Sequence, residues 1–185
     1  MPDRYVGIDL AGNPKNETGF CVLEIDGDKK SVSTCILRSD SDIIDRVRKA
    51  DPTIIAIDAP LTYAGVNRRC DIDLSSYGAL PVTLRGMEVL ALRGTAFAKE
   101  LSLLKYKTIE VYSTASAKIL GLYSQNEMES YKNLLSAGLD GDVQRRLLTK
   151  DEMDAVYAAL TAYLYATGAT EKVGDSAGEI VIPKV

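Results

Sequence analysis

Alternating apolar and polar positions in the first forty residues predict three successive strands. The runs that alternate in this way are residues 4–11, 18–25 and 31–38. Turn-forming residues separate them, a longer set over residues 12–17 and the pair Gly27-Asp28. Because the links are short, we expect the three strands to form an antiparallel meander.

The rest of the chain alternates between helical and strand patterns. Residues 53–58 form a nearly all-apolar run typical of a central strand covered on both faces, and residues 108–113 predict a fifth strand. Helical spacing predicts helices over residues 40–49, from Leu84 to Leu104, over residues 114–136 with breaks at Gly121 and before Glu127, and along the stripe Met153, Tyr157, Leu160, Leu164 that ends at Gly168.

This order of elements predicts an α/β fold. If residues 53–58 run parallel to residues 4–11 through a right-handed crossover, the result is a mixed five-stranded sheet of order 3-2-1-4-5 flanked by helices. The tail from Lys172 to Pro183 is expected to form a small hairpin. We expect residues 1–185 to be one domain.

Composition narrows the class of protein. The chain has 185 residues, of which 46% are hydrophobic and 26% charged, as in ordinary soluble globular proteins. No apolar run is long enough to span a membrane and no signal pattern is present, so we expect a cytoplasmic protein without membrane contact. The three cysteines lack metal-ligand spacing and fit reduced thiols. Since histidine is absent, Ser-His and Cys-His catalysis and His-ligated metals are excluded.

Charge is spread unevenly. The net charge of −4 does not favour general nucleic-acid binding, but residues 61–107 carry seven basic and four acidic side chains. Two interpretations stay open, a basic wall beside an acidic site and a solvated surface.

Two short strands end in the same way, in a carboxylate. The matching sequences are Gly7-Ile8-Asp9-Leu10-Ala11 and Ala56-Ile57-Asp58-Ala59-Pro60. Aspartate is depleted in strands, and a buried carboxylate is costly unless it is paired, hydrogen-bonded or metal-bound. Ligands favour the C-terminal strand ends at the point where connections leave toward opposite sides of a sheet. We therefore expect Asp9 and Asp58 to converge there.

The last helix offers two more acids. Asp151 and Asp154 are three residues apart and lie on one helical face, and Asp154 lies beside the apolar stripe. Four carboxylates would raise one another's pKa unless a cation were present, and Mg²⁺ or Mn²⁺ prefers oxygen ligands. Two such ions support phosphodiester hydrolysis without histidine.

Structural interpretations of the same acids stay open. Thr149 and Glu152 form a capping box, which accounts for an acid at position 151 through the helix dipole. Asp9 would alternatively bond backbone amides near Gly12, and Asp58 would cap the turn at Pro60.

A further group of charged residues has no settled role. Glu110 interrupts the fifth strand, either as another acid of the site or as the partner of an arginine. Arg68, Arg69 and Asp71 are candidates for phosphate contact, with a surface ion-pair cluster as the alternative.

Taken in order, these motifs resemble the RNase H-like superfamily, and in particular an uncharacterised prokaryotic family of predicted nucleases with that fold. The resemblance covers nearly the whole chain. It rests on residues 7–11 and 56–61, on Arg69-Cys70-Asp71, on residues 109–112, and on Asp151-Glu152-Met153-Asp154-Ala155.

The resemblance implies a nuclease or phosphodiesterase with Asp9, Asp58, Asp151 and Asp154 holding two Mg²⁺ or Mn²⁺ ions. No helix residue matches the glutamate of RNase H proper, so the arrangement of acids resembles that of RuvC-type resolvases. Implied partners are nucleic acid or another phosphodiester, and a homodimer is compatible with it. The alternatives are a nucleotide-binding relative of actin and sugar kinases, through a hairpin like Asp9–Gly19, and a non-catalytic binding module.

Overall fold

The first three strands form the expected antiparallel meander. The computed structural model, which describes residues 2–184, pairs β1 (Asp3–Asp9) with β2 (Thr18–Asp26), and β2 with β3 (Lys29–Leu37). On the other side of β1, β4 (Ile54–Asp58) runs parallel to it, and β5 (Thr108–Val111) runs parallel to β4. The predicted order 3-2-1-4-5 is therefore confirmed as the centre of the sheet.

The sheet is larger than predicted. It has eight strands in the order β6-β3-β2-β1-β4-β5-β8-β7. The C-terminal hairpin of β7 (Thr170–Asp175) and β8 (Gly178–Pro183) is not a separate appendage, because β8 pairs with β5 through Val111 and Val181. The two-residue strand β6 (Asp140–Gly141) adds to β3. Both additions cover edges whose backbone groups would otherwise be unpaired.

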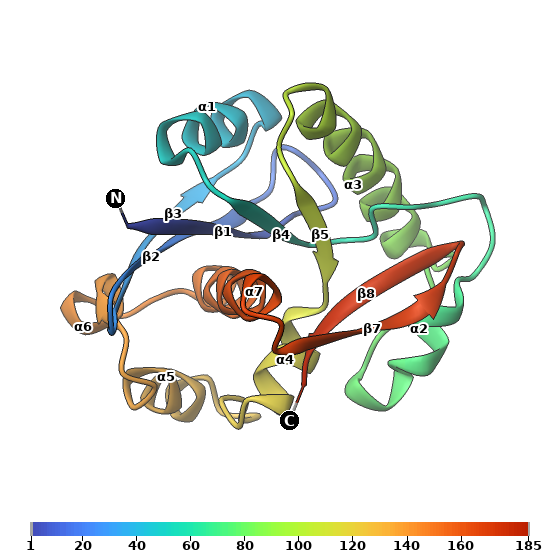
Figure 1. Cartoon of the computed structure of the whole chain (residues 1–185). Coiled ribbons are helices and arrows are strands. Elements are labelled where there is room, and N and C mark those ends of the chain that lie inside the picture. Colours follow the sequence, from blue (N-terminus) through green and yellow to red (C-terminus); the bar gives the residue numbers. More distant parts are fainter. Residues whose placement is uncertain (1, 185) are drawn as a thin grey trace.

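Helices cover both faces of the sheet (Figure 1). The helices α1 (Asp40–Ala50) and α3 (Arg85–Leu103) lie on one face, and α7 (Lys150–Ala166) lies on the other. The shorter helices are α2 (Arg69–Asp73), the 3-10 turn η1 (Ser75–Tyr77), α4 (Ser113–Ile119), α5 (Glu127–Leu135) and α6 (Asp142–Arg145). The predicted break at Gly121 is confirmed, since this glycine has a positive φ between α4 and α5.

Strand β4 contributes to two cores, as its apolar run predicts. Ile55 and Ile57 are fully buried against α1 and α3, whereas Ile54 and Ala56 pack on the side of α7. With both faces covered, the carboxylate that ends the strand enters a region of low water access.

Glycines let α7 approach the sheet closely. A Cβ added at Gly7 would lie far inside van der Waals distance of the Ala155 carbonyl, and one at Gly19 would meet the Asp151 carbonyl. Gly19 is also the partner of Asp9 in the β1–β2 ladder. The first turn of α7 is thereby held next to the end of β1.

Gly7→Ala is expected to lower the free energy of unfolding by about 1–3 kcal/mol or more, because α7 must move away from β1. The measurement is urea unfolding followed by circular dichroism. Gly86→Ala is the matched control, because a Cβ added at Gly86 in α3 meets open space. This variant should raise the free energy of unfolding by up to about 1 kcal/mol. Equal small effects at both glycines would contradict the close approach of α7.

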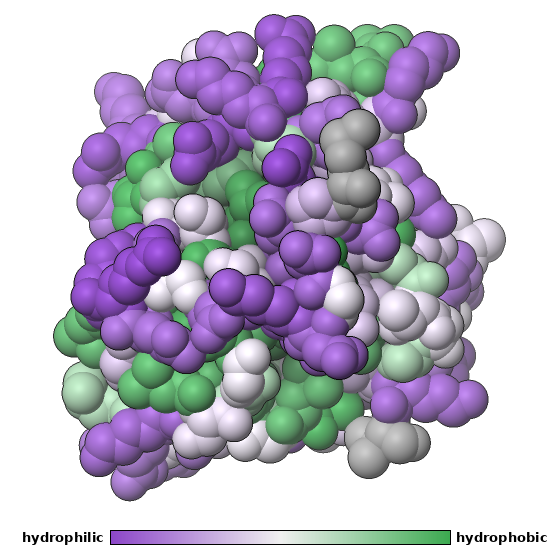
Figure 2. All heavy atoms as spheres, turned by 60° about the vertical axis from the view of Figure 1, so that its left-hand side comes forward, coloured by the Kyte–Doolittle hydropathy of each residue, from purple (hydrophilic) through white to green (hydrophobic). Residues whose placement is uncertain are grey.

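The surface on the side of β3 and α6 is mostly hydrophilic, with hydrophobic atoms in separate patches (Figure 2). The three cysteines are free thiols, two of them buried. Among the described residues, no helix is both long and apolar enough to cross a bilayer.

Candidate functional site

Asp9 and Asp58 lie side by side. They are the last residues of the parallel neighbours β1 and β4, and the register sets them directly opposite each other. Burial, followed by the charges of Asp58 and Asp154, raises the pKa of Asp9 well above its ordinary value. Burial and then Asp154 raise the pKa of Asp58 to about 7. Two carboxylates in this position favour a shared proton or a bound cation.

The first turns of α7 bring two more acids to the same place. Asp154 is largely buried, with 13% of its side chain exposed, and burial raises its pKa. The charge of Asp151 also raises the pKa of Asp9. Glu152, between them, points elsewhere: it binds Arg146 at 2.6 Å and completes the predicted capping box with Thr149. We refer to Asp9, Asp58, Asp151 and Asp154 as the acid cluster.

Lys150 supplies a cation to this cluster. Its Nζ lies 2.8 Å from Asp154 Oδ2, and although burial opposes it, this hydrogen bond raises the pKa of the amine. The side chain is 63% exposed, so the ammonium lies at the outer edge of the site. One positive charge against four carboxylates leaves the cluster with an excess of negative charge.

The start of α4 orients two of the acids. The Ser113 amide donates to Asp58 Oδ2 at 3.1 Å, and the Ser113 hydroxyl donates to the Asp154 carbonyl at 2.9 Å. Asp58 therefore accepts from the first residue of α4, which follows the neighbouring strand β5. Among the described residues, the alternative of a cap on the Pro60 turn is not observed. Within residues 2–184, no group donates a hydrogen bond to the Asp9 carboxylate, so the alternative of backbone amides near Gly12 is not observed either.

The arrangement suits a divalent cation chemically. All four side chains offer oxygen ligands, the ligand type that Mg²⁺ and Mn²⁺ prefer. The raised pKa values of Asp9, Asp58 and Asp154 show that burial and the like charges destabilise the ionised cluster by itself. A bound cation would relieve this cost.

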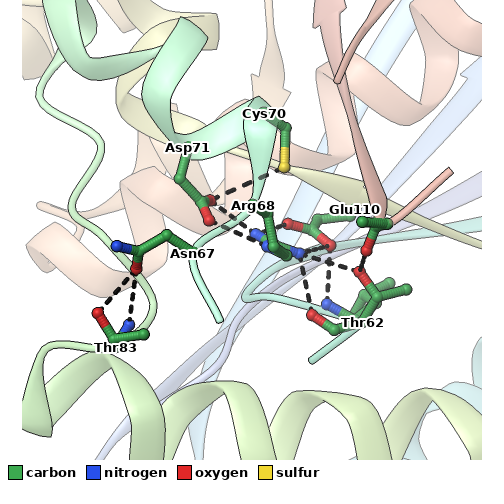
Figure 3. Close-up of polar contacts among 9 residues, drawn as sticks. Thr62, Asn67, Arg68, Cys70, Asp71, Thr83 and Glu110 are labelled. Atoms are coloured by element: carbon green, nitrogen blue, oxygen red, sulfur yellow. Dashed lines mark hydrogen bonds and ion pairs between the residues drawn. The ribbon is translucent and has the colours of Figure 1, made fainter. Parts of the chain in front are cut away.

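A second group of charged side chains, separate from the acid cluster, is centred on Arg68. Glu110 on β5 and Asp71 on α2 both bind the Arg68 guanidinium at 2.7 Å, and all three side chains are almost fully buried (Figure 3). The expectation of a surface cluster is therefore wrong for Arg68 and Asp71, and Glu110 is the partner of an arginine. We refer to Arg68, Asp71 and Glu110 as the Arg68 cluster.

The Arg68 cluster is built as a structural support. The guanidinium donates from Nε and both terminal nitrogens to Asp71, Glu110 and Thr62, which engages every nitrogen (Figure 3). Glu110 also accepts from the Leu61 amide at 2.8 Å. These bonds fasten the segment between β4 and α3 to β5. Arg68 therefore has no free donor for a phosphate.

Cys70, Asp71 and Glu110 also place a sulfur and two carboxylate oxygens within 4.8 Å of one another, a spacing compatible with a metal ion. In the structure, however, the Arg68 guanidinium already binds both carboxylates. Burial raises the pKa of the Cys70 thiol to about 12, which keeps it protonated. Among the described residues, no three carboxylates of the acid cluster come within this distance of one another, but the cluster sets four acids against the single cation of Lys150.

Two of the seven basic residues of the 61–107 segment, Arg68 and Arg93, are buried and take no part in a basic wall at the surface. Arg93 is buried and binds Asp40 together with the carbonyls of Ala11 and Arg38. Arg69 forms an exposed pair with Asp73 at 3.0 Å. Arg68 and Arg93 thus serve internal packing, whereas Arg69 is held in a surface ion pair.

Two neighbours of the acids were not anticipated from the sequence. The Lys150–Asp154 spacing of four residues is a signal for a helical ion pair, although the reverse order of charges is the more favourable one. The contact of Ser113 with Asp58 has no local signal, because it depends on β5 lying next to β4.

Comparison with known proteins supports the fold. Among solved structures, the RuvC of Thermus thermophilus matches with a TM-score of 0.55 and 12% sequence identity, over 97% of this chain and 100% of that one. No protein-family model matches the chain, and no curated protein matches it in sequence. At this identity the likeness concerns architecture alone: the chain shares the fold of that RuvC structure.

Proposed function

We propose that the protein is a divalent-metal-dependent nuclease that hydrolyses phosphodiester bonds at the acid cluster. The observation that carries this proposal is the register of β1 and β4, which sets Asp9 directly opposite Asp58 at the end of two buried strands. The RuvC-like fold supports it, as does the resemblance of the acid motifs to those of RuvC-type resolvases.

Asp9 and Asp58 would hold the metal, with Asp154 and Asp151 completing the oxygen ligands from α7. The chemistry that bound Mg²⁺ or Mn²⁺ supplies is activation of water and neutralisation of charge on the leaving oxygen. The Ser113 amide fixes the Asp58 carboxylate, and the Ser113 hydroxyl fixes the α7 backbone at Asp154. These contacts hold the Asp58 side chain and the first turns of α7 in place beside Asp9.

Lys150 has a separate part in this proposal. Its ammonium binds Asp154 and lies at the exposed edge of the cluster. A cation there attracts the phosphate of an approaching substrate and limits the repulsion between that phosphate and the acids.

The decisive experiment is calorimetric titration of Mn²⁺ into the native protein, Asp9→Asn and Asp58→Asn. We expect binding to the native protein and its loss in both variants, since each removes a central ligand. Asp28→Asn, on the exposed β2–β3 turn, is the matched control and should bind as the native protein does. Metal-dependent cleavage is then assayed on single-stranded, duplex and branched DNA and on RNA. Unchanged Mn²⁺ binding in both site variants would refute the proposal.

A further inference from the structure

A pocket of about 160 Å³ opens beside the acid cluster. Asp9 and Asp58 line one part of it, and the Arg68 cluster lines another. Most of the remaining wall is apolar. This wall includes Leu10, Leu80, Met87, Leu90, Tyr112 and Ile180.

The pocket is of the size of one aromatic ring. An apolar cavity of roughly 150 Å³ is known to hold a benzene molecule. Leu80 belongs to the wall with 53% of its surface exposed, so the apolar surface continues to the outside. A six-membered ring fits this space, and a base pair does not.

The wall also offers a ring for stacking. Tyr112 directly follows β5 and lines the pocket. Burial raises the pKa of its phenol, and the nearby charges of Asp58 and Asp154 raise it further. Bases stack on tyrosine without regard to sequence. A ligand that combines an aromatic ring with a phosphate one sugar away is a nucleotide.

We propose that this pocket receives one unpaired pyrimidine base of the substrate, with the adjoining phosphate at the Asp9–Asp58 end. The inference rests on the proposed nuclease function and names its substrate class. A base inside a continuous duplex must leave the stack to enter a pocket, which costs free energy, whereas an unpaired base does not have to. The preferred substrate is therefore single-stranded or locally unpaired nucleic acid.

The segment over the pocket is fastened well enough to keep this shape. Besides the bonds of Arg68, Asn67 Oδ1 accepts from the Thr83 hydroxyl at 2.7 Å, which joins the residue before Arg68 to the end of the segment next to α3 (Figure 3). The Thr62 hydroxyl donates to the Ala177 carbonyl at 2.8 Å, on the hairpin of β7 and β8. With this part of its wall tied to β5 and to the hairpin, the pocket binds a base without first having to form.

Methionine methyl NMR tests the pocket without any need for cleavage. Met87 lies in the pocket wall, while Met128 on α5 is 50% exposed and is not part of that wall. With ¹³C-methyl methionine and Mg²⁺, we expect thymidine 5′-monophosphate to shift the Met87 signal saturably and to leave Met128 unchanged. Deoxyribose 5-phosphate should bind about fivefold to a hundredfold more weakly, because it lacks the stacking base. No Met87 shift, or equal shifts with both probes, would overturn the inference.

The two proposals fail differently. If Mn²⁺ binds the acid cluster but thymidine 5′-monophosphate leaves Met87 unchanged, the base pocket is refuted and the metal site stands. If Met87 responds while neither Mn²⁺ nor Mg²⁺ binds, the pocket stands and the nuclease proposal is refuted.

A pair of variants tests the size of the pocket. Met87→Ala enlarges the pocket, which gives a purine more room. In anisotropy titrations it should therefore reduce the ratio of the affinity for fluorescein-labelled hexathymidylate to that for hexaadenylate. Met128→Ala is the same substitution outside the pocket and should keep the native preference. Identical preferences in the native protein and both variants would exclude a base at Met87.

Discussion

Asp58→Asn is expected to make the metal-free protein progressively more stable, relative to the native protein, as the pH rises from about 5 to about 8. The folded-state pKa of Asp58 is about 7, against 3.8 for the ordinary carboxyl, with burial as the main cause. Because its folded-state pKa is raised, Asp58 keeps its proton to a higher pH in the folded protein than in the unfolded chain. Its contribution to stability is complete at low pH and is lost as the pH rises through 7.

The size of this change follows from the pKa. Between about pH 5 and pH 8, deprotonation of Asp58 lowers the free energy of unfolding of the native protein by on the order of 2–3 kcal/mol. The asparagine variant has no such loss. Asparagine keeps an oxygen that accepts from the Ser113 amide, so the α4 contact is preserved. Urea unfolding in the presence of a chelator, at several pH values, measures the difference between the two proteins.

Asp28→Asn serves as the control for this series, because its carboxylate is exposed on the β2–β3 turn and has no burial to relieve. With saturating Mg²⁺ at about pH 8, the native protein should be more stable than Asp58→Asn. Binding to the folded state stabilises only the protein that retains its ligands. A difference between native and Asp58→Asn protein that stays constant with pH would contradict the raised pKa of Asp58.

The centre of the sheet was predictable because its signals are local. Each strand can be recognised from its own residues alone, through alternation over residues 18–25 and 31–38 and through the apolar run of residues 53–58. The position of Asp9 and Asp58 at strand ends was equally visible. Their meeting required only the handedness rule for the crossover between the two strands.

The parts that were missed depend on contacts between distant residues. The two residues of β6 are too few to carry any pattern, and the pairing of Val111 with Val181 joins strands far apart in sequence. Glu110 between two apolar residues indicates a buried acid that needs a partner, but its partner is 42 residues away in the chain. Arg68 and Arg69 look alike in sequence; only the fold decides which one is buried.

The buried arginine is expected to give the largest loss of stability. Arg68→Met should lower the free energy of unfolding by about 3–5 kcal/mol, because it leaves the buried carboxylates of Asp71 and Glu110 without a counterion. Arg69→Met, at the next residue in the chain and the first of α2, breaks only an exposed pair with Asp73 and should cost about 0–1 kcal/mol.

The combination of Arg68→Met with Glu110→Gln separates loss of charge balance from loss of packing. If uncompensated charge is the cause, removing the Glu110 charge should recover part of the loss, and the two substitutions should couple strongly in a double-mutant cycle. Full additivity, or equal small losses at Arg68 and Arg69, would contradict the role of the Arg68 cluster. The same variants connect stability to the pocket: since Arg68 fastens the segment that carries Leu80, the Met87 methyl should respond to Arg68→Met and remain unchanged in Arg69→Met.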